Sequence, residues 1–401
     1  MATRPRQSAA VRRRAWSAHA ERLALDGRAP QLSEAKRNYR LIDDRALKLQ
    51  LAREIAQTRA PELTLGYRNL VGVVAGFKRK SNKLGKAALT REPCVIFIVR
   101  SKWRSKTTGG DQRLPSHVTA FADWQGRRRM VAVPTDVQLE TGWIAATQGL
   151  SAVQVKVGSR QDFGTLACVV KVSQSQHYDY CGLSALHVLS PPWLTGNGLP
   201  CAGHAVQGLS APGGGAVPWG TSILAGGMLP PSPDIGFDAQ LANLTDWRSV
   251  RKQLGQQNVL SLSEPFVQTP ARFDELVTAD GGATFEILIP DNHPKAPGRP
   301  RLFAVFDSYI ERGVPIAYQT GEGGERYVSH FELLKLAPLG GQTTRPGDSG
   351  SLVVLHTGSR YTIVGMHIAG GNGFSCVLPA WQLFSPFNYR DLPEGCEIFP
   401  M

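Results

Sequence analysis

Residues 347–371 read GDSGSLVVLHTGSRYTIVGMHIAGG, a serine between two glycines followed by two strand-like runs. Glycine on both sides of Ser349 permits a tight turn that exposes the serine hydroxyl. The runs 352–355 and 361–367 are rich in apolar and β-branched residues, and a polar turn separates them. This pattern predicts a β-hairpin directly after the serine, as expected if the serine loop sits on a β-barrel.

The sequence around this stretch, from about residue 141 to 401, predicts many short strands. Runs of Val, Ile, Leu and Thr alternate there with clusters of Gly, Pro, Asn and Ser, which is typical of a β-sandwich or a barrel. Residues 61–140 contain β-rich runs such as LVGVVAGFKRK between polar segments and predict a small α+β unit. We therefore predict a mainly β protein with a β domain over residues 141–401.

Residues 1–60 are basic and predict a helical N-terminal region. They hold 14 Lys and Arg residues against 6 Asp and Glu residues, whereas the whole chain has a net charge of +13. Helix-forming residues dominate from residue 8 onward, although the segment 27–30 would interrupt a helix. Aromatic residues are nearly absent, so we expect a solvated helical hairpin rather than a nucleic-acid-binding arm. The apolar positions with helical spacing are Leu41, Leu47, Leu51 and Ile55.

A serine hydroxyl is a weak nucleophile near neutral pH. Acyl transfer therefore needs an imidazole base, a carboxylate that orients this base, and backbone amides directed at the developing oxyanion. The glycine-rich turn could direct the amides of Gly347 and Ser349 toward one point, which makes these residues the candidate oxyanion hole. Gly, Asp and Ser also form ordinary structural turns, so the motif alone leaves that alternative open.

Two motifs in the chain resemble those of the trypsin-like serine peptidases, which have the chymotrypsin fold. GDSG at 347–350 matches the family's nucleophile motif, and LSALHV at 183–188 matches the motif that carries the base. The resemblance looks strongest to bacterial members and covers about residues 150–390. It implies a double β-barrel with the active site between the barrels, with His187 as the base and Ser349 as the nucleophile.

The same resemblance implies a triad aspartate between these two motifs. Asp238 begins the sequence DAQLANL, which matches the expected D-x-x-L-x-x-L pattern, and Asp234 is the alternative. If Asp234 were the acid, Asp238 would remain as a charge in a strand beneath the site, which is costly without a partner. We therefore favour Asp238, whose carboxylate would hold the imidazole tautomer and stabilise the imidazolium.

In this family, residues just before the nucleophile and on a later strand select the substrate residue before the scissile bond (P1). Thr344, together with His367 in GMHIAGG, resembles the pocket of glutamyl-specific bacterial peptidases and of 3C-type viral peptidases. The resemblance implies hydrogen-bond donors for a Glu or Gln side chain. The backbone of Ala369 and Gly370 could pair with an extended substrate. The alternative for His367 is a buried structural histidine satisfied by a backbone group.

The chain lacks the signals of several other protein classes. It has no apolar run long enough for a membrane-spanning helix and no closely spaced cysteine pair of the kind that holds zinc. We expect no metal and no cofactor. The spacing of the six cysteines predicts free thiols, and no apolar stretch follows the basic N-terminus as in a secretory signal, so we expect a cytoplasmic protein without a membrane partner.

The expected partner is a protein or peptide substrate. The chain contains no trypsin-type activation sequence, so Asp348 needs a partner other than a freed N-terminus. Activity could therefore depend on the N-terminal region, through a regulatory protein or through self-association. Two alternatives stay open: a nucleic-acid partner for residues 1–60, and a catalytically silent scaffold with the protease fold. The complete set of triad residues argues against the silent scaffold.

Overall fold

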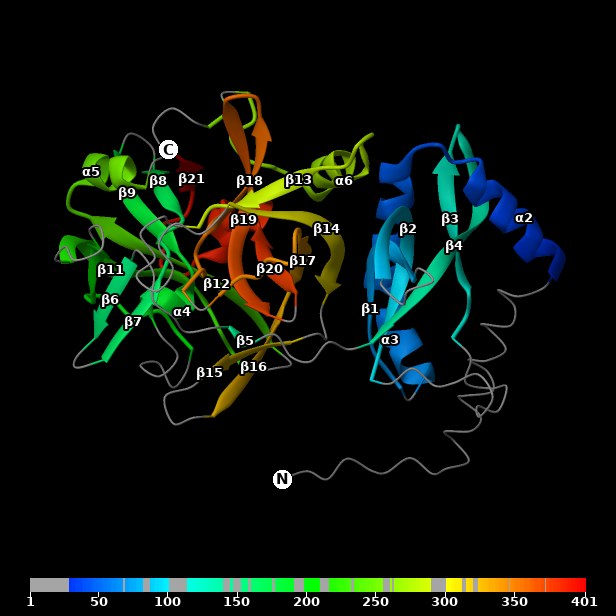
Figure 1. Ribbon diagram of the computed structural model, residues 1–401, viewed down its shortest axis with the longest axis horizontal. Coiled ribbons are helices and arrows are strands. Elements are labelled where there is room, and N and C mark those ends of the chain that lie inside the picture. Colours follow the sequence, from blue (N-terminus) through cyan, green and yellow to red (C-terminus); the bar gives the residue numbers. More distant parts are fainter. Residues whose placement is uncertain are drawn as a thin grey trace. The chain divides into compact units, whose positions relative to one another are not determined.

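The residues described by the computed structural model are 29–67, 69–81, 87–100, 114–139, 145–146, 153–157, 160–174, 177–190, 198–209, 216–231, 234–254, 260–261, 263–289, 301–311, 315–319, 324–345, 347–371 and 373–401. The chain divides into two compact units, Met1–Glu140 (unit 1) and Thr141–Met401 (unit 2). Figure 1 labels the elements of both units. The helix predicted over residues 8–28 lies outside the described residues, and the predicted division at residue 60 stays a prediction.

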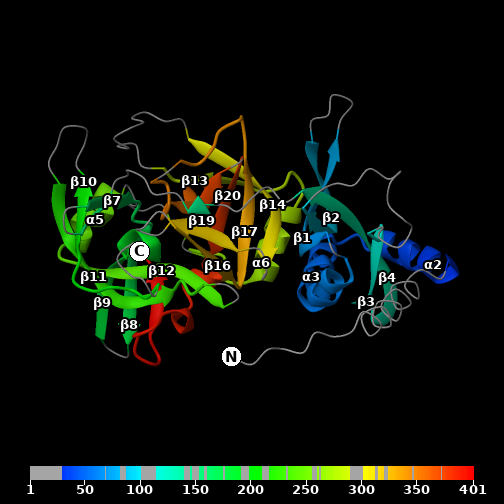
Figure 2. The same cartoon turned by 90° about the horizontal axis from the view of Figure 1, so that it is seen from below.

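Unit 1 combines two helices with a sheet in the strand order β1-β2-β4-β3. Strands β2 and β4 are parallel, and the other two pairs are antiparallel. Helix α3 packs on β1 and β2, as Figure 2 shows, and α2 packs on β4. The elements are α2 (Ala29–Arg40), α3 (Arg45–Gly66), β1 (Leu70–Ser81), β2 (Ala87–Val99), β3 (His117–Trp124) and β4 (Arg127–Leu139).

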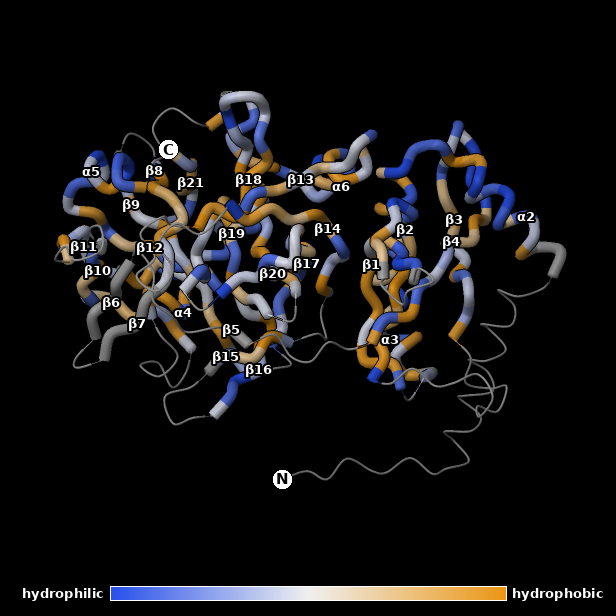
Figure 3. Tube along the Cα trace, in the orientation of Figure 1, coloured by the Kyte–Doolittle hydropathy of each residue, from blue (hydrophilic) through white to orange (hydrophobic). Residues whose placement is uncertain are grey.

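Local sequence explains where α3 begins and which face it buries. The Asp44 side chain caps the helix by accepting hydrogen bonds from the amides of Ala46 and Leu47. Leu51 and Ile55, four residues apart, are buried as the predicted helical spacing requires. Helix α3 contacts β1, a strand drawn mostly in hydrophobic colours in Figure 3.

Two details of unit 1 differ from the sequence-based prediction. Leu41, expected on a helix face, lies in the turn after α2 and is 48% exposed. Helix α3 does not end near residue 60 but continues through Pro61 to Gly66. Proline lacks the amide donor that a helix interior needs, yet Leu63 in the next turn is completely buried. Tertiary packing of this last turn therefore outweighs the local cost of the proline.

Six strands of unit 2 close into an antiparallel barrel. Their order is β13-β18-β19-β20-β17-β14, and β14 pairs back with β13. The hairpin predicted after the serine is the β18–β19 pair, whose register runs from Leu352 opposite Met366 to Thr357 opposite Arg360. The barrel strands are β13 (Thr284–Ile287), β14 (Leu302–Glu311), β17 (Glu332–Pro338), β18 (Leu352–Thr357), β19 (Arg360–Gly371) and β20 (Phe374–Pro379).

A second sheet of unit 2 has the strand path β21-β8-β9-β12-β11-β10-β6-β7. Strand β16 pairs in parallel with β12, and β15 pairs with both β16 and β5. Among the described strands, the pairings leave this path open at both ends. Its strands are β5 (Ala145–Ala146), β6 (Val153–Val157), β7 (Arg160–Gly164), β8 (Cys168–Gln174), β9 (His177–Ser184), β10 (Ala205–Leu209), β11 (Ala216–Met228), β12 (Ile235–Leu244), β15 (Ile316–Gln319), β16 (Glu325–His330) and β21 (Glu397–Pro400).

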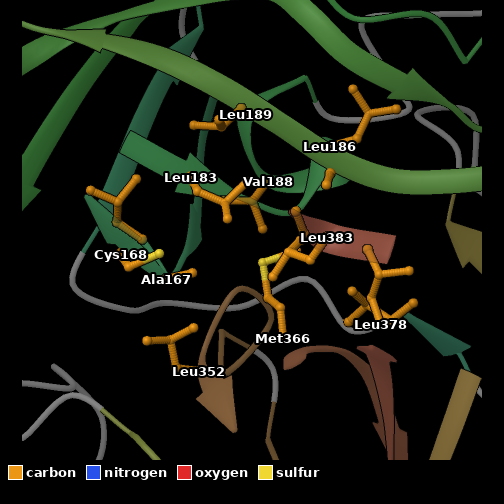
Figure 4. Close-up of a cluster of buried hydrophobic side chains, with 14 of the residues drawn as sticks. Ala167, Cys168, Leu183, Leu186, Val188, Leu189, Leu352, Met366, Leu378 and Leu383 are labelled. Atoms are coloured by element: carbon orange, nitrogen blue, oxygen red, sulfur yellow. The ribbon is translucent and has the colours of Figure 1, made fainter. Parts of the chain in front are cut away.

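The two sheets of unit 2 share one hydrophobic core. In Figure 4, Leu183 and Val188, at and after the end of β9, lie in the same cluster as Met366 of β19. The predicted mainly β class is thus confirmed, with one closed barrel and a second sheet. The described helical segments of unit 2 are short: α4 (Leu186–Leu189), α5 (Trp247–Gln253), α6 (Pro270–Thr278), α7 (Ala380–Leu383) and the 3-10 turn η2 (Pro386–Asn388).

Two further predictions concern cysteines and membranes. All six cysteines are free in the structure, as predicted from their spacing. Among the described residues, no helix combines the length and the apolar character needed to cross a membrane.

Candidate active site

The second sheet brings His187 and Asp238 together. His187 lies in α4, the single helical turn after β9, and Asp238 lies on the neighbouring strand β12. The His187 Nδ1 atom is 2.7 Å from Asp238 Oδ2, and the His187 amide donates to Asp238 Oδ1 at 3.2 Å. Both side chains are buried, whereas Asp234, the alternative acid, is exposed. The geometry therefore pairs His187 with Asp238.

The charge of Asp238 is maintained despite complete burial. Burial alone would raise the pKa of this carboxyl group, but attraction to His187 and hydrogen bonds from its ring and amide hold the pKa below its usual range. An ionised carboxylate only accepts hydrogen bonds, so the Nδ1 atom of His187 carries the proton. In this tautomer Nε2 carries no proton and can accept one. The Nε2 atom is buried and has no hydrogen-bond partner among the described residues.

Asp238 has a further neighbour that the sequence analysis missed. The hydroxyl of Tyr318, on β15, donates to Asp238 Oδ2 at 2.9 Å and lies 3.0 Å from Nε2 of His330, on β16. Burial lowers the pKa of His330 to about 4, so its imidazole is neutral at neutral pH.

Ser349 lies in a buried, glycine-dependent turn. The φ angles of Gly347 and Gly350 are 98° and 95°, in the left-handed region that favours glycine. Asp348, expected to need an outside partner, is buried and accepts a hydrogen bond at 2.7 Å from the amide of Arg345 in its own loop. In the described part of the chain, the amides of Gly347 and Ser349 donate no hydrogen bond. They are thus available to a ligand oxygen.

Thr165 connects this turn to the sheet that carries His187. Its carbonyl accepts from Ser184 Oγ at 2.7 Å, and its amide donates to the Ser349 carbonyl at 2.7 Å. Its hydroxyl donates to the Gly347 carbonyl at 3.0 Å. A Cβ atom at Gly350 would lie 1.8 Å from the Thr165 carbonyl oxygen, so any side chain there would force the two segments apart. The sequence analysis assigned no role to Thr165.

The Ser349 hydroxyl itself donates to the carbonyl of Ile368 at 3.1 Å and not to His187. Catalytic hydrogen bonds are often absent or long before substrate binds and form in the complex. Transfer of the serine proton to His187 would therefore require the hydroxyl to turn away from Ile368.

Thr344 and His367 lie together against the backbone of Gly370. A Cβ atom at Gly370 would be 1.9 Å from Thr344 Oγ1 and 3.1 Å from His367 Cε1. Among the described residues, Thr344 Oγ1 and His367 Nε2 are buried without a hydrogen-bond partner. The other ring nitrogen of His367 contacts Ser375 Oγ at 2.6 Å. Two buried polar atoms are thus left for a ligand.

The charge state of His367 and the edge of its strand affect what could bind. Burial and, to a smaller extent, the nearby His187 lower the pKa of His367 to about 3, so the ring is neutral at neutral pH. Pairing of β18 with β19 ends at Met366, whereas Ala369 and Gly370 pair only with β20 among the barrel strands. In the described part of the chain, no barrel strand pairs with their second edge, although β5 contacts β19.

The described residues contain no group of three or more His, Cys, Asp or Glu side chains placed to hold a metal ion. A scan against protein-family models finds no match for the chain, and a search of curated proteins finds no significant match.

Proposed function

We propose that the chain is a serine endopeptidase. The observation that carries this proposal is the buried His187–Asp238 pair, in which Nε2 has no hydrogen-bond partner among the described residues. Thr165 connects the sheet that carries this pair to the Ser349 turn. We also propose that the sheet containing β9 and β12 is the first barrel of a chymotrypsin-like pair and that the closed barrel is the second. The contacts of Asp348 within its own loop argue that a freed N-terminus is not needed to order the turn.

The arrangement supports acyl transfer in two steps. The Ser349 oxygen attacks the substrate carbonyl while His187 Nε2 takes the hydroxyl proton, and the amides of Gly347 and Ser349 stabilise the oxyanion. The imidazolium then gives its proton to the leaving amine, and an acyl-enzyme ester remains. Water, deprotonated by His187, attacks this ester and releases the acid and the serine. Asp238 stays ionised throughout and stabilises the imidazolium.

Labelling with a fluorophosphonate probe tests this proposal. These probes form a stable ester only with a serine that a neighbouring base activates. We expect the full-length protein to be labelled, and mass spectrometry of the digested protein to place the adduct on Ser349. A folded protein that remains unlabelled would overturn the peptidase proposal and favour the silent scaffold.

The P1 pocket is proposed to prefer Gln over Glu at neutral pH. Thr344 Oγ1 and His367 Nε2 offer two buried polar atoms, and both side chains are neutral there. A neutral amide can satisfy such groups, whereas a buried carboxylate would need a compensating charge. The resemblance implies a preference for Glu or Gln at P1. Because the polar groups of the pocket are neutral, we propose Gln as the preferred residue of the two.

Two peptides that differ only in Gln or Glu at P1 test this preference. At pH 7.5 we expect kcat/KM to favour Gln by about tenfold or more, because the Glu carboxylate must be neutralised on burial. As the pH falls toward the ordinary Glu pKa of about 4.3, the Glu peptide becomes neutral and the ratio should approach one. Both peptides are measured with the same enzyme at each pH, so a loss of enzyme activity in acid does not change the ratio of their kcat/KM values. A preference for Glu at pH 7.5, or cleavage mainly after Arg or Phe, would contradict this assignment.

A further inference from the structure

Unit 1 contains a cavity with strongly basic walls. Its volume is about 460 Å³, and residues of α2, α3 and all four strands line it. Among the described residues, the only carboxylate in its lining is Glu92. The basic side chains around it are Lys36, Arg40, Arg45, Lys48, Lys80 and Arg91.

Three of these basic side chains are not neutralised by an acidic neighbour among the described residues. In the described part of the chain, Lys36, Arg40 and Lys80 form no ion pair. Like charges that face one another across a cavity repel and focus a positive potential inside it. An anion bound there would relieve this repulsion.

Two titratable groups in the lining respond to this environment. Burial and the positive charges of Lys36, Lys78 and Arg40 lower the pKa of His117 to about 4. The pKa of Lys48 is also lowered, mainly by burial, although Asp43 and Glu92 oppose the change. Burial is the main cause of both pKa shifts, and for His117 the neighbouring cations add to it.

We infer that this cavity binds a small molecule carrying several phosphate groups. Its volume is within the range of ligand-binding cavities, and its cations come from separate elements: Lys36 and Arg40 from α2, Lys48 from α3 and Lys80 from β1. Cations contributed by three separate elements suit a ligand with several anionic groups better than a single phosphate. Lys and Arg side chains are the usual donors to phosphate oxygens.

The aromatic lining argues against recognition of a nucleobase. Tyr39 is buried, and its hydroxyl donates to the Pro93 carbonyl at 3.0 Å. The ammonium group of Lys48 lies 5.0 Å from the centre of the Tyr39 ring and occupies one of its faces. Proteins that bind single-stranded nucleic acid stack bases on accessible aromatic rings, which this cavity does not offer. Phosphate is therefore the group that the cavity recognises.

Calorimetric titration of the full-length protein with inorganic tripolyphosphate tests this inference. At about 0.15 M ionic strength we expect saturable binding with one site per chain. ATP should bind with similar affinity, because the base makes no stacking contact, and orthophosphate should bind at least about tenfold more weakly. The double variant Arg40→Gln, Lys80→Gln should weaken tripolyphosphate binding by about tenfold or more.

The matched control is Arg37→Gln, Arg127→Gln, which removes the same charge from exposed positions of unit 1 outside the cavity lining. We expect this control to bind tripolyphosphate like the wild type. Circular dichroism of both double variants checks that they are folded. Absence of tripolyphosphate binding, or equal weakening by both double variants, would overturn the inference. Tighter binding of a single-stranded RNA oligonucleotide than of tripolyphosphate would also overturn it and identify a nucleic-acid surface instead.

Discussion

Replacement of Ser349 with alanine is expected to lower kcat for peptide hydrolysis by about a million-fold, the loss seen when a nucleophile of this type is removed. The change deletes the attacking oxygen and one hydrogen bond, to the carbonyl of Ile368. Loss of a neutral hydrogen bond costs about 1 kcal/mol, so the variant should remain folded. Initial rates with a fluorogenic peptide, together with a thermal melt of each protein, provide the measurement.

Ser351→Ala is the matched control for this experiment. Ser351 is buried two residues away in the same loop, and its hydroxyl has no hydrogen-bond partner among the described residues. We expect the control to retain activity within about tenfold of wild type, since it loses no satisfied hydrogen bond. If the two variants lost activity equally, packing of the loop rather than nucleophilic attack would account for the loss, and the peptidase proposal would fail.

Asp238→Asn is expected to reduce kcat by about ten-thousand-fold near neutral pH. An amide at this position can donate to Nδ1 of His187, which moves the imidazole proton to Nε2 and removes the acceptor for the Ser349 proton. The imidazolium would also lose its counter-charge. Steady-state rates and fluorophosphonate labelling, both measured at pH 7.5, should fall together because both depend on the same base.

Two further variants assign this effect to the carboxylate that contacts His187. Asp234→Asn makes the same chemical change at an exposed carboxylate and should leave activity unchanged. Tyr318→Phe removes one donor to Asp238 but keeps the pair with His187. We expect Tyr318→Phe to lower activity about tenfold, which corresponds to the loss of one hydrogen bond to a charged group. The variant should also shift the pH profile of kcat/KM. A loss for Asp234→Asn comparable to that for Asp238→Asn would exclude Asp238 as the acid.

The residues that the sequence could identify are those whose chemistry imposes a local pattern. The turn around Ser349 needs glycine at positive φ, and the β18–β19 hairpin after it needs alternating apolar runs, so both are visible in a short stretch of sequence. Likewise, a charge within a buried strand is costly without a partner. This argument favoured Asp238 over Asp234 as the triad acid. These arguments require no knowledge of distant contacts.

The groups that support the site could not be predicted in this way. Tyr318 contacts Asp238 across 80 residues of sequence, and Thr165 contacts Gly347 across 182. Tyr318 lies on a strand and Thr165 in the short connection between β7 and β8. Both residue types are ordinary at such places in a β protein, so neither contact could be read from the local sequence. The contact of His367 with Ser375 depends on the β19–β20 register. The continuation of α3 beyond Pro61 depends on burial of Leu63, which local propensity does not reveal.

The position of Thr165 has a consequence for when a cell would encounter this activity. During synthesis the segment with His187 leaves the ribosome well before the segment with Ser349, yet the serine turn takes its shape against Thr165. A nascent chain that has folded only the β8–β9 region therefore holds a base without a nucleophile. If the chain has the proposed peptidase function, its activity would begin only after the later barrel has folded and docked.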